Sequence, residues 1–125
     1  MRIDYWNISG GISQQEAGAI VIAEGFEFEL GRISRFENAR NAVVIAKTDL
    51  QNELVNRVLL AEELQHGHDR QTHQAAKAIR RGLSNDEFHA ELFQRLVERC
   101  RAGELSFLTE NDIQGLLTVL KELQS

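Results

Sequence analysis

The chain has 125 residues, 42% of them hydrophobic, which is enough for one domain with a buried core and too little for two. Fourteen basic and nineteen acidic side chains give a net charge of −5 with no basic block, so nucleic-acid binding is not expected. The longest apolar run, 17–23, is far shorter than the roughly 20 residues that cross a bilayer, so no membrane span is expected.

Two further features of composition concern the compartment. Cys100 is the single cysteine, so no internal disulfide can form and the fold does not depend on an oxidising environment. The first residues lack the pattern of a signal peptide. We therefore expect one domain, residues 1–125, that folds in the cytoplasm.

Residues 17–46 form the β-rich part of this domain. Short runs of Ile and Val occupy 20–22 and 43–46, and apolar and polar residues alternate strictly over 26–30. Such runs are typical of strands, and Gly25 separates the first two. We expect a short antiparallel sheet built from strands near Ile20, Phe26 and Val43.

Residues 49–123 have helical periodicity instead. The first helical segment extends from about 49 to 81, because Gly82 suits a left-handed cap after two arginines, and Gly67 is expected to bend or break it.

Two more helices follow the first segment. One begins at Ser84, which forms a capping box with Glu87, and ends before Gly103. The last begins at Thr109, with Asp112 three residues on, and closes over the core. The expected fold class is α+β, a short antiparallel sheet packed on about three α-helices.

The first helical segment changes character along one face. At about 100° per residue, its apolar residues Val55, Val58 and Leu59 lie on one stripe. The stripe continues with polar residues, namely Glu62, His66, Asp69 and His73. Carboxylate and imidazole groups on a buried face need partners in the interior, and a metal ion is one such partner. His68 lies on the other side of the helix and is expected at the surface.

The spacing of Glu62 and His66 is that of two metal ligands on one helix. Side chains four residues apart share a face and can both reach one ion, and a third ligand from elsewhere completes an open zinc site. Glu63 stands where a zinc protease has the glutamate that accepts a proton from water, whereas Glu62 stands where its signature has histidine.

The second helix offers the third ligand. Its apolar arc contains Phe88, Leu92, Phe93 and Leu96, and His89 projects from near the centre of that arc, whereas Glu91 points nearly the opposite way. His89 is therefore expected to face the interior.

The chain resembles the zincin-like metallopeptidase domains found as toxin modules in bacterial polymorphic toxin systems. The likeness covers about Phe26 to the C-terminus and depends on three stretches, namely Glu62–His66, Glu87–Phe93 and Phe107–Asp112. It implies a zinc ion bound by Glu62 and His66 and a general base at Glu63. It also implies a protein or peptide substrate, a cognate immunity protein, and action after delivery into another cell.

Three other interpretations stay open. An inactive relative would also lack the first histidine of the motif. A metal-free interaction module, such as an immunity or adaptor protein, would use Glu62, His66 and His89 as a buried hydrogen-bond network. A di-iron protein would use Glu63-x-x-His66 and Asp86-x-x-His89, although such bundles need four core helices.

Overall fold

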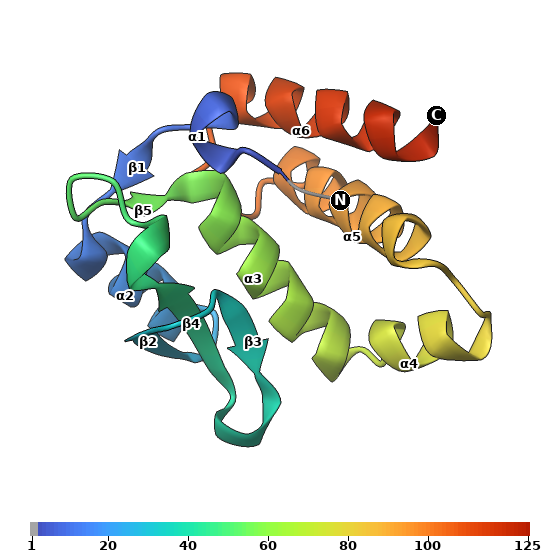
Figure 1. The fold of residues 1–125 in the computed structure, drawn as a ribbon, viewed down its shortest axis with the longest axis horizontal. Helices are drawn as coiled ribbons and strands as arrows, with labels where there is room; N and C mark the ends of the chain where they lie inside the picture. Colours follow the sequence, from blue (N-terminus) through green and yellow to red (C-terminus); the bar gives the residue numbers. More distant parts are fainter. Residues whose placement is uncertain (1–2) are drawn as a thin grey trace.

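The structure is a computed structural model and describes residues 3–125. Within this range it has six α-helices and five short strands (Figure 1). In chain order they are α1 (Tyr5–Ile8), β1 (Gly11–Ile12), α2 (Gln14–Ala23), β2 (Glu27–Gly31), β3 (Arg35–Glu37), β4 (Ala42–Ala46), β5 (Val55–Asn56), α3 (Arg57–Gln71), α4 (Gln74–Arg80), α5 (Asn85–Arg101) and α6 (Glu110–Gln124). The strands lie in the N-terminal half and helices dominate the rest, so the α+β class is confirmed. No helix among the described residues is long and apolar enough to cross a bilayer.

The main sheet is mixed, which corrects the expectation of an antiparallel one. Its strand order is β2-β4-β3, with β4 parallel to β2 and antiparallel to β3. The chain reverses between β2 and β3 and again between β3 and β4, so the fully buried β4 enters between the other two strands. Strand β3, only three residues long, was missed by sequence analysis. A separate antiparallel pair joins β1 to β5.

The strand expected near Ile20 is wrong, because these residues belong to helix α2. The helix begins before the apolar run, where the Ser13 side chain caps it by accepting a hydrogen bond from the Glu16 backbone N–H. Ala17 and Val21, four residues apart, are its buried positions, whereas Ile22 is exposed. The Ser13-x-x-Glu16 pattern is a helix-start signal that outweighs the β-branched run after it.

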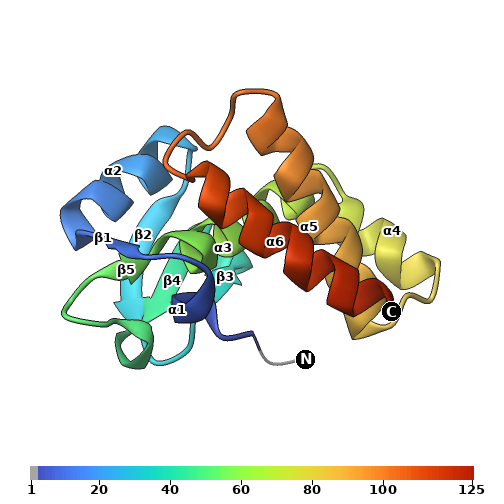
Figure 2. The ribbon, with the colours of Figure 1, turned by 90° about the horizontal axis from the view of Figure 1, so that it is seen from above.

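Helix α3 is the centre of the molecule. It lies between β3 and β4 on one side and α5 on the other (Figure 1), and α6 packs across α5 (Figure 2). Gly67 does not break the helix. A side chain there would meet the rings of Phe26 and Phe36 at less than ordinary contact distance, so glycine lets the sheet approach α3 closely. The chain breaks after Gln71 instead, where His73 adopts a left-handed conformation.

The last two helices each begin with a capping box, the first of which was expected from the sequence. The Ser84 side chain accepts from the Glu87 backbone N–H and the Glu87 carboxylate accepts from the Ser84 backbone N–H, and Thr109 and Asp112 do the same at the start of α6. Gly82 has a φ of +68°, as the expected cap requires. Local hydrogen bonds thus set where these two helices begin.

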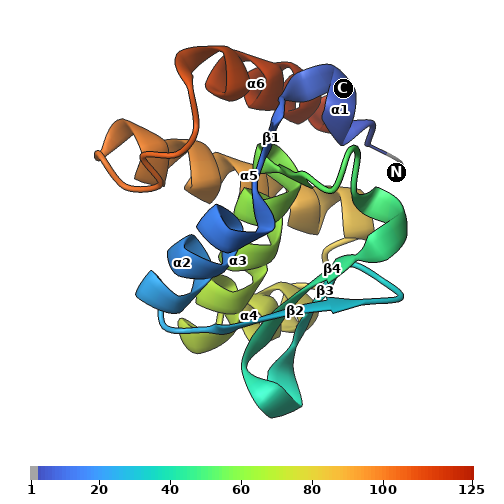
Figure 3. The ribbon, with the colours of Figure 1, turned by 90° about the vertical axis from the view of Figure 1, so that its left-hand side faces the viewer.

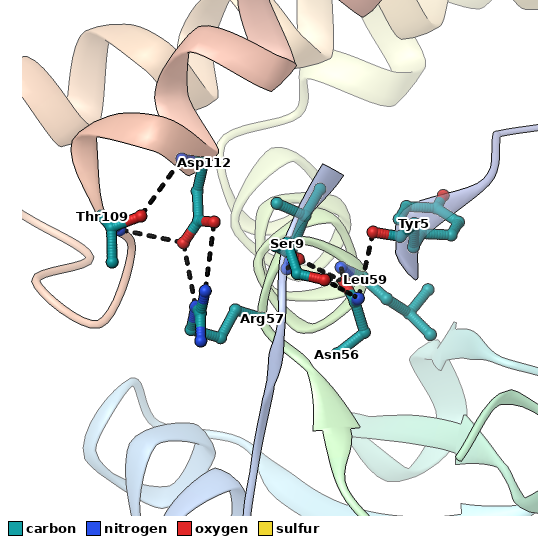
Figure 4. Close-up of polar contacts among 8 residues, drawn as sticks. Tyr5, Ser9, Asn56, Arg57, Leu59, Thr109 and Asp112 are labelled. Carbon is teal, nitrogen blue, oxygen red and sulfur yellow. Dashed lines mark hydrogen bonds and ion pairs between the residues drawn. The ribbon is translucent and has the colours of Figure 1, made fainter. Parts of the chain in front are cut away.

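A buried polar junction holds the N-terminal segment against the start of α3 (Figure 4). The Asn56 side chain caps α3 by accepting from the backbone N–H groups of Val58 and Leu59, and it donates to the backbone carbonyls of Tyr5 and Ser9. Helix α1 consequently lies beside the first turns of α3, with α6 on its other side (Figure 3).

Candidate metal centre

Three side chains from two helices converge beside the sheet. Helix α3 carries Glu62 and His66, and α5 carries His89 near its start. One potential ligand atom from each lies within 4.8 Å of the other two. The Nε2 atoms of His66 and His89 lie 3.8 and 3.7 Å from the same Glu62 oxygen, Oε1. We call Glu62, His66 and His89 the histidine cluster.

The two oxygens of Glu62 face different partners. Oε1 points to both imidazoles, whereas Oε2 accepts a hydrogen bond from the hydroxyl of Tyr5. Tyr5 reaches Glu62 from α1, which the Asn56 junction holds in place. The hydrogen bond fixes the carboxylate so that one oxygen stays directed at the imidazoles, in the manner of an outer-shell partner of a metal ligand.

The His89 ring is oriented by its own helix. Its Nδ1 lies 2.8 Å from the backbone carbonyl oxygen of Asn85, and because a carbonyl can only accept, Nδ1 carries the proton. In the neutral ring this leaves Nε2, the atom facing Glu62, with a free lone pair. The rings of Phe88 and Phe93 pack around the two imidazoles.

Burial and neighbouring carboxylates shift the pKa values of Glu63 and His66. Burial and the charge of Glu62 raise the pKa of Glu63 to about 8. Burial alone would lower the pKa of His66, but the Glu62 and Glu63 carboxylates outweigh it and the net shift is upward. Because Glu62 and Glu63 are only 5% and 6% exposed, negative charge on both at once is costly unless a cation lies near them.

The geometry fits one metal ion better than a set of direct hydrogen bonds. Separations of 3.7 and 3.8 Å are too long for hydrogen bonds between nitrogen and oxygen. Two ligands of a tetrahedral zinc ion, with bonds of about 2.0–2.1 Å, lie about 3.3 Å apart, which a small inward movement of the side chains would reach. Two imidazoles with one carboxylate form a recurrent donor set for zinc and for iron(II).

The histidine cluster opens into a pocket of about 780 Å³. Glu62, Glu63, His66 and His89 all line it, so the side chains that could bind a metal are reachable from solution. The opposite side of the pocket is formed by the link between β2 and β3, by β3 itself and by the segment after β4. A volume of this size accommodates several residues of a peptide.

The sequence analysis succeeded for some residues and failed for others. Glu62, His66 and His89 do meet, and Glu63 lies next to them. Asp69 does not, because it is fully buried in an ion pair with Arg95, and His73 is exposed beyond the end of α3. His68 is not a plain surface residue: it is half-buried, and its Nδ1 has no hydrogen-bond partner among residues 3–125.

Sequence analysis also missed Tyr5. It lies 57 residues before Glu62, and a lone tyrosine has no spacing that links it to a metal motif. Tyr5 lies in a short helical turn just before Ser9 and Gly10, and nothing in this local sequence predicts a contact with α3.

Comparisons of the sequence with protein-family models and with curated proteins, and of the fold with solved structures, found no match. The interpretation of the site therefore depends on its own geometry and chemistry.

Proposed function

We propose that this chain is a zincin-like, zinc-dependent peptidase in which Glu62, His66 and His89 hold the ion and Glu63 is the general base. The observation that carries the proposal is the convergence of three ligand atoms within 4.8 Å at the wall of an open pocket, with Glu63 beside them. The position of Glu63, directly after Glu62, also supports the proposal, because a zinc protease motif has its general base there.

The chemistry divides between the ion and the chain. A bound zinc ion would polarise the scissile carbonyl and lower the pKa of water to about 7. Glu63, which lies beside the histidine cluster, would take the proton from the attacking water and pass it to the leaving amine. Tyr5 would hold Glu62 in its ligating orientation.

The same proposal includes a biological setting. Following the likeness to toxin modules of bacterial polymorphic toxin systems, the substrate is a protein or peptide inside a target cell reached by delivery. A cognate immunity protein then protects the producing cell. The open pocket beside the histidine cluster is the surface that such an inhibitor would cover.

Two observations count against the alternatives. A metal-free hydrogen-bond network would need shorter contacts than the 3.7 and 3.8 Å from Glu62 to the two imidazoles. A di-iron centre would need Asp86 near the metal, yet Asp86 is exposed, and the histidine cluster contains one carboxylate.

The test begins with metal content. Protein purified without added metal and then exposed to one equivalent of zinc should retain about one zinc per chain by elemental analysis. His66→Ala should lose the metal and the thermal stabilisation that comes with it. His73→Asn is the matched control, because His73 is exposed and asparagine tolerates its left-handed backbone. Equal zinc content in both variants would contradict the assignment.

Catalysis is tested with a peptide library and by expression in bacteria. The zinc-loaded parent should cleave some library peptides, and its inducible expression in the cytoplasm should reduce colony numbers, whereas Glu63→Gln should do neither. Tight zinc binding without any cleavage would identify an inactive relative. Equal toxicity of the parent and Glu63→Gln would contradict a toxic effect based on hydrolysis.

A further inference from the structure

Three arginines line the pocket that contains the histidine cluster. They are Arg32, in the link between β2 and β3, Arg35, at the start of β3, and Arg70, in the last turn of α3. Arg70 follows His66 by four residues, so it lies on the same face of α3 as Glu62 and His66. The pocket thus has guanidinium groups both on the helix that carries the cluster and on the opposite wall.

Two of these arginines have no partner within the part of the chain that the structure describes. The side chains of Arg32 and Arg70 are exposed and form no hydrogen bond or ion pair among residues 3–125. Arg35 is partly engaged, because it donates to the Ile33 carbonyl and lies 3.5 Å from the Glu37 carboxylate. The unpaired guanidinium groups remain available to a ligand.

Two of the three acidic residues that line the same pocket, Asp49 and Glu62, are already engaged. Asp49 accepts a hydrogen bond from Ser34, and Glu62 accepts from Tyr5 and faces the two imidazoles. A divalent cation at the histidine cluster would further offset Glu62 and Glu63. The pocket is then positive although the chain as a whole has a net charge of −5.

We propose that Arg32 and Arg70 make this pocket selective for peptides with a carboxylate side chain close to the scissile bond. The proposal rests on the peptidase function proposed above and names its substrate class. Arginine binds carboxylates through two parallel hydrogen bonds, and a concave, partly desolvated wall strengthens such pairs. Nucleic acid is the less favoured anion, because the acidic chain has no basic track beyond the pocket to follow a phosphate backbone.

The experiment measures binding and cleavage with matched peptides. The probes are fluorescein-labelled octapeptides of alanine and serine that contain one glutamate, and a second set with glutamine at the same position. Affinity is measured by fluorescence anisotropy on the zinc-loaded Glu63→Gln protein, which should bind peptides without turnover. Cleavage is measured in parallel on the zinc-loaded parent by mass spectrometry.

Glutamate peptides should bind about tenfold more tightly than their glutamine counterparts, as expected for a charge-assisted hydrogen bond at a partly exposed site. Arg32→Gln and Arg70→Gln should each reduce this preference, and the double variant should abolish it. Arg70→Glu should transfer the preference to lysine-containing peptides. Arg80→Gln, an exposed arginine on α4 outside the pocket, should leave the tenfold preference intact.

The outcomes separate this inference from the peptidase proposal. Cleavage of peptides without any acidic preference would overturn the inference and leave the peptidase proposal standing. Arginine-dependent binding of acidic peptides that the parent never cleaves would support the ligand class and overturn the peptidase. A preference that survives in the double variant would overturn the inference. The inference would also be overturned if an oligothymidine probe bound more tightly than any peptide and if this binding depended on the arginines.

Discussion

Helices α3 and α5 share two polar clusters. The side chains of one cluster form hydrogen bonds and ion pairs with each other, whereas those of the other lie too far apart for hydrogen bonds between them. In the arginine cluster, made of Gln65, Asp69, Arg95 and Arg99, Arg95 pairs with both oxygens of Asp69, and Gln65 donates to Asp69 and accepts from Arg99. In the histidine cluster the corresponding contacts are 3.7 and 3.8 Å long, and the side chain of the adjacent Glu63 forms no hydrogen bond or ion pair within residues 3–125.

The difference shows which cluster requires something from outside the chain. Buried carboxylates need compensating positive charge, and an arginine in a bidentate pair supplies it for Asp69. Glu62 and Glu63 face imidazoles whose charge depends on protonation. The arginine cluster therefore joins α3 to α5, whereas the histidine cluster is suited to bind a cation.

The largest expected effect is on catalysis and tests whether Glu63 is the general base. Glu63→Gln keeps the shape of the side chain and removes the proton acceptor, so the rate of peptide cleavage should fall by roughly 10²–10⁴. Zinc content should stay at about one per chain. Glu62→Gln is the contrast, because it should weaken zinc binding itself; loss of zinc in Glu63→Gln instead would assign Glu63 as a ligand.

The next effect separates structure from metal binding. Asp69→Asn leaves the Arg95 guanidinium without its buried anion and should lower the free energy of unfolding by about 3 kcal/mol in urea titrations. Zinc should still raise the melting temperature of this variant by as much as it raises that of the parent. Glu29→Gln, at the exposed pair with Arg40, is the control and should leave the free energy of unfolding nearly unchanged. If zinc no longer stabilised Asp69→Asn, the two clusters would be one functional unit.

A smaller effect is expected from Tyr5→Phe, which removes only the hydroxyl that Glu62 accepts from. Loss of an outer-shell partner should reduce zinc affinity about 10–100-fold in competition with a zinc chelator. Unfolding measured in the presence of a chelator should change by only about 1 kcal/mol, because one hydrogen bond is lost. Unchanged zinc affinity would mean that Tyr5 supports the fold alone.

The smallest effect concerns a third polar pair, Arg57 with Asp112, which joins α3 to α6 (Figure 4). Burial alone would raise the pKa of Asp112, but hydrogen bonds from Arg57 and Thr109 outweigh it and the pKa is lowered. This stabilisation is present above the pKa of the unfolded chain, about 3.9, and is lost as pH falls through the lower folded value.

The matching measurement compares the parent with Asp112→Asn in urea titrations. Their difference in unfolding free energy should be constant above about pH 5 and should shrink as pH falls below about 4. If the difference grew on acidification, the pKa of Asp112 would be raised in the folded protein and not lowered. Zinc should not change this difference in unfolding free energy, because Arg57 and Asp112 already satisfy each other and need no cation.

Local sequence signals predicted the later helices well and the N-terminal half less well. Capping boxes at Ser84 and Thr109 are complete within four residues, so they determine where α5 and α6 begin whatever lies around them. Strand order involves contacts between distant residues. The parallel pairing of β2 with β4 depends on where β3 reverses the chain, and no periodicity within either strand encodes that.

The sequence by itself determined the α+β class and the ligand spacing within helices. A separation of four residues places Glu62 and His66 on one face in any α-helix, and the apolar arc around His89 turns that ring inward. Only the tertiary structure decided which groups complete the site. Tyr5 and the arginines of the pocket arrive from segments far from the motif, and the same face of α3 that directs Glu62 to the pocket directs Asp69 to Arg95. The reason is that helical geometry sets direction around one axis, whereas partners come from packing against other elements, which depends on the whole chain.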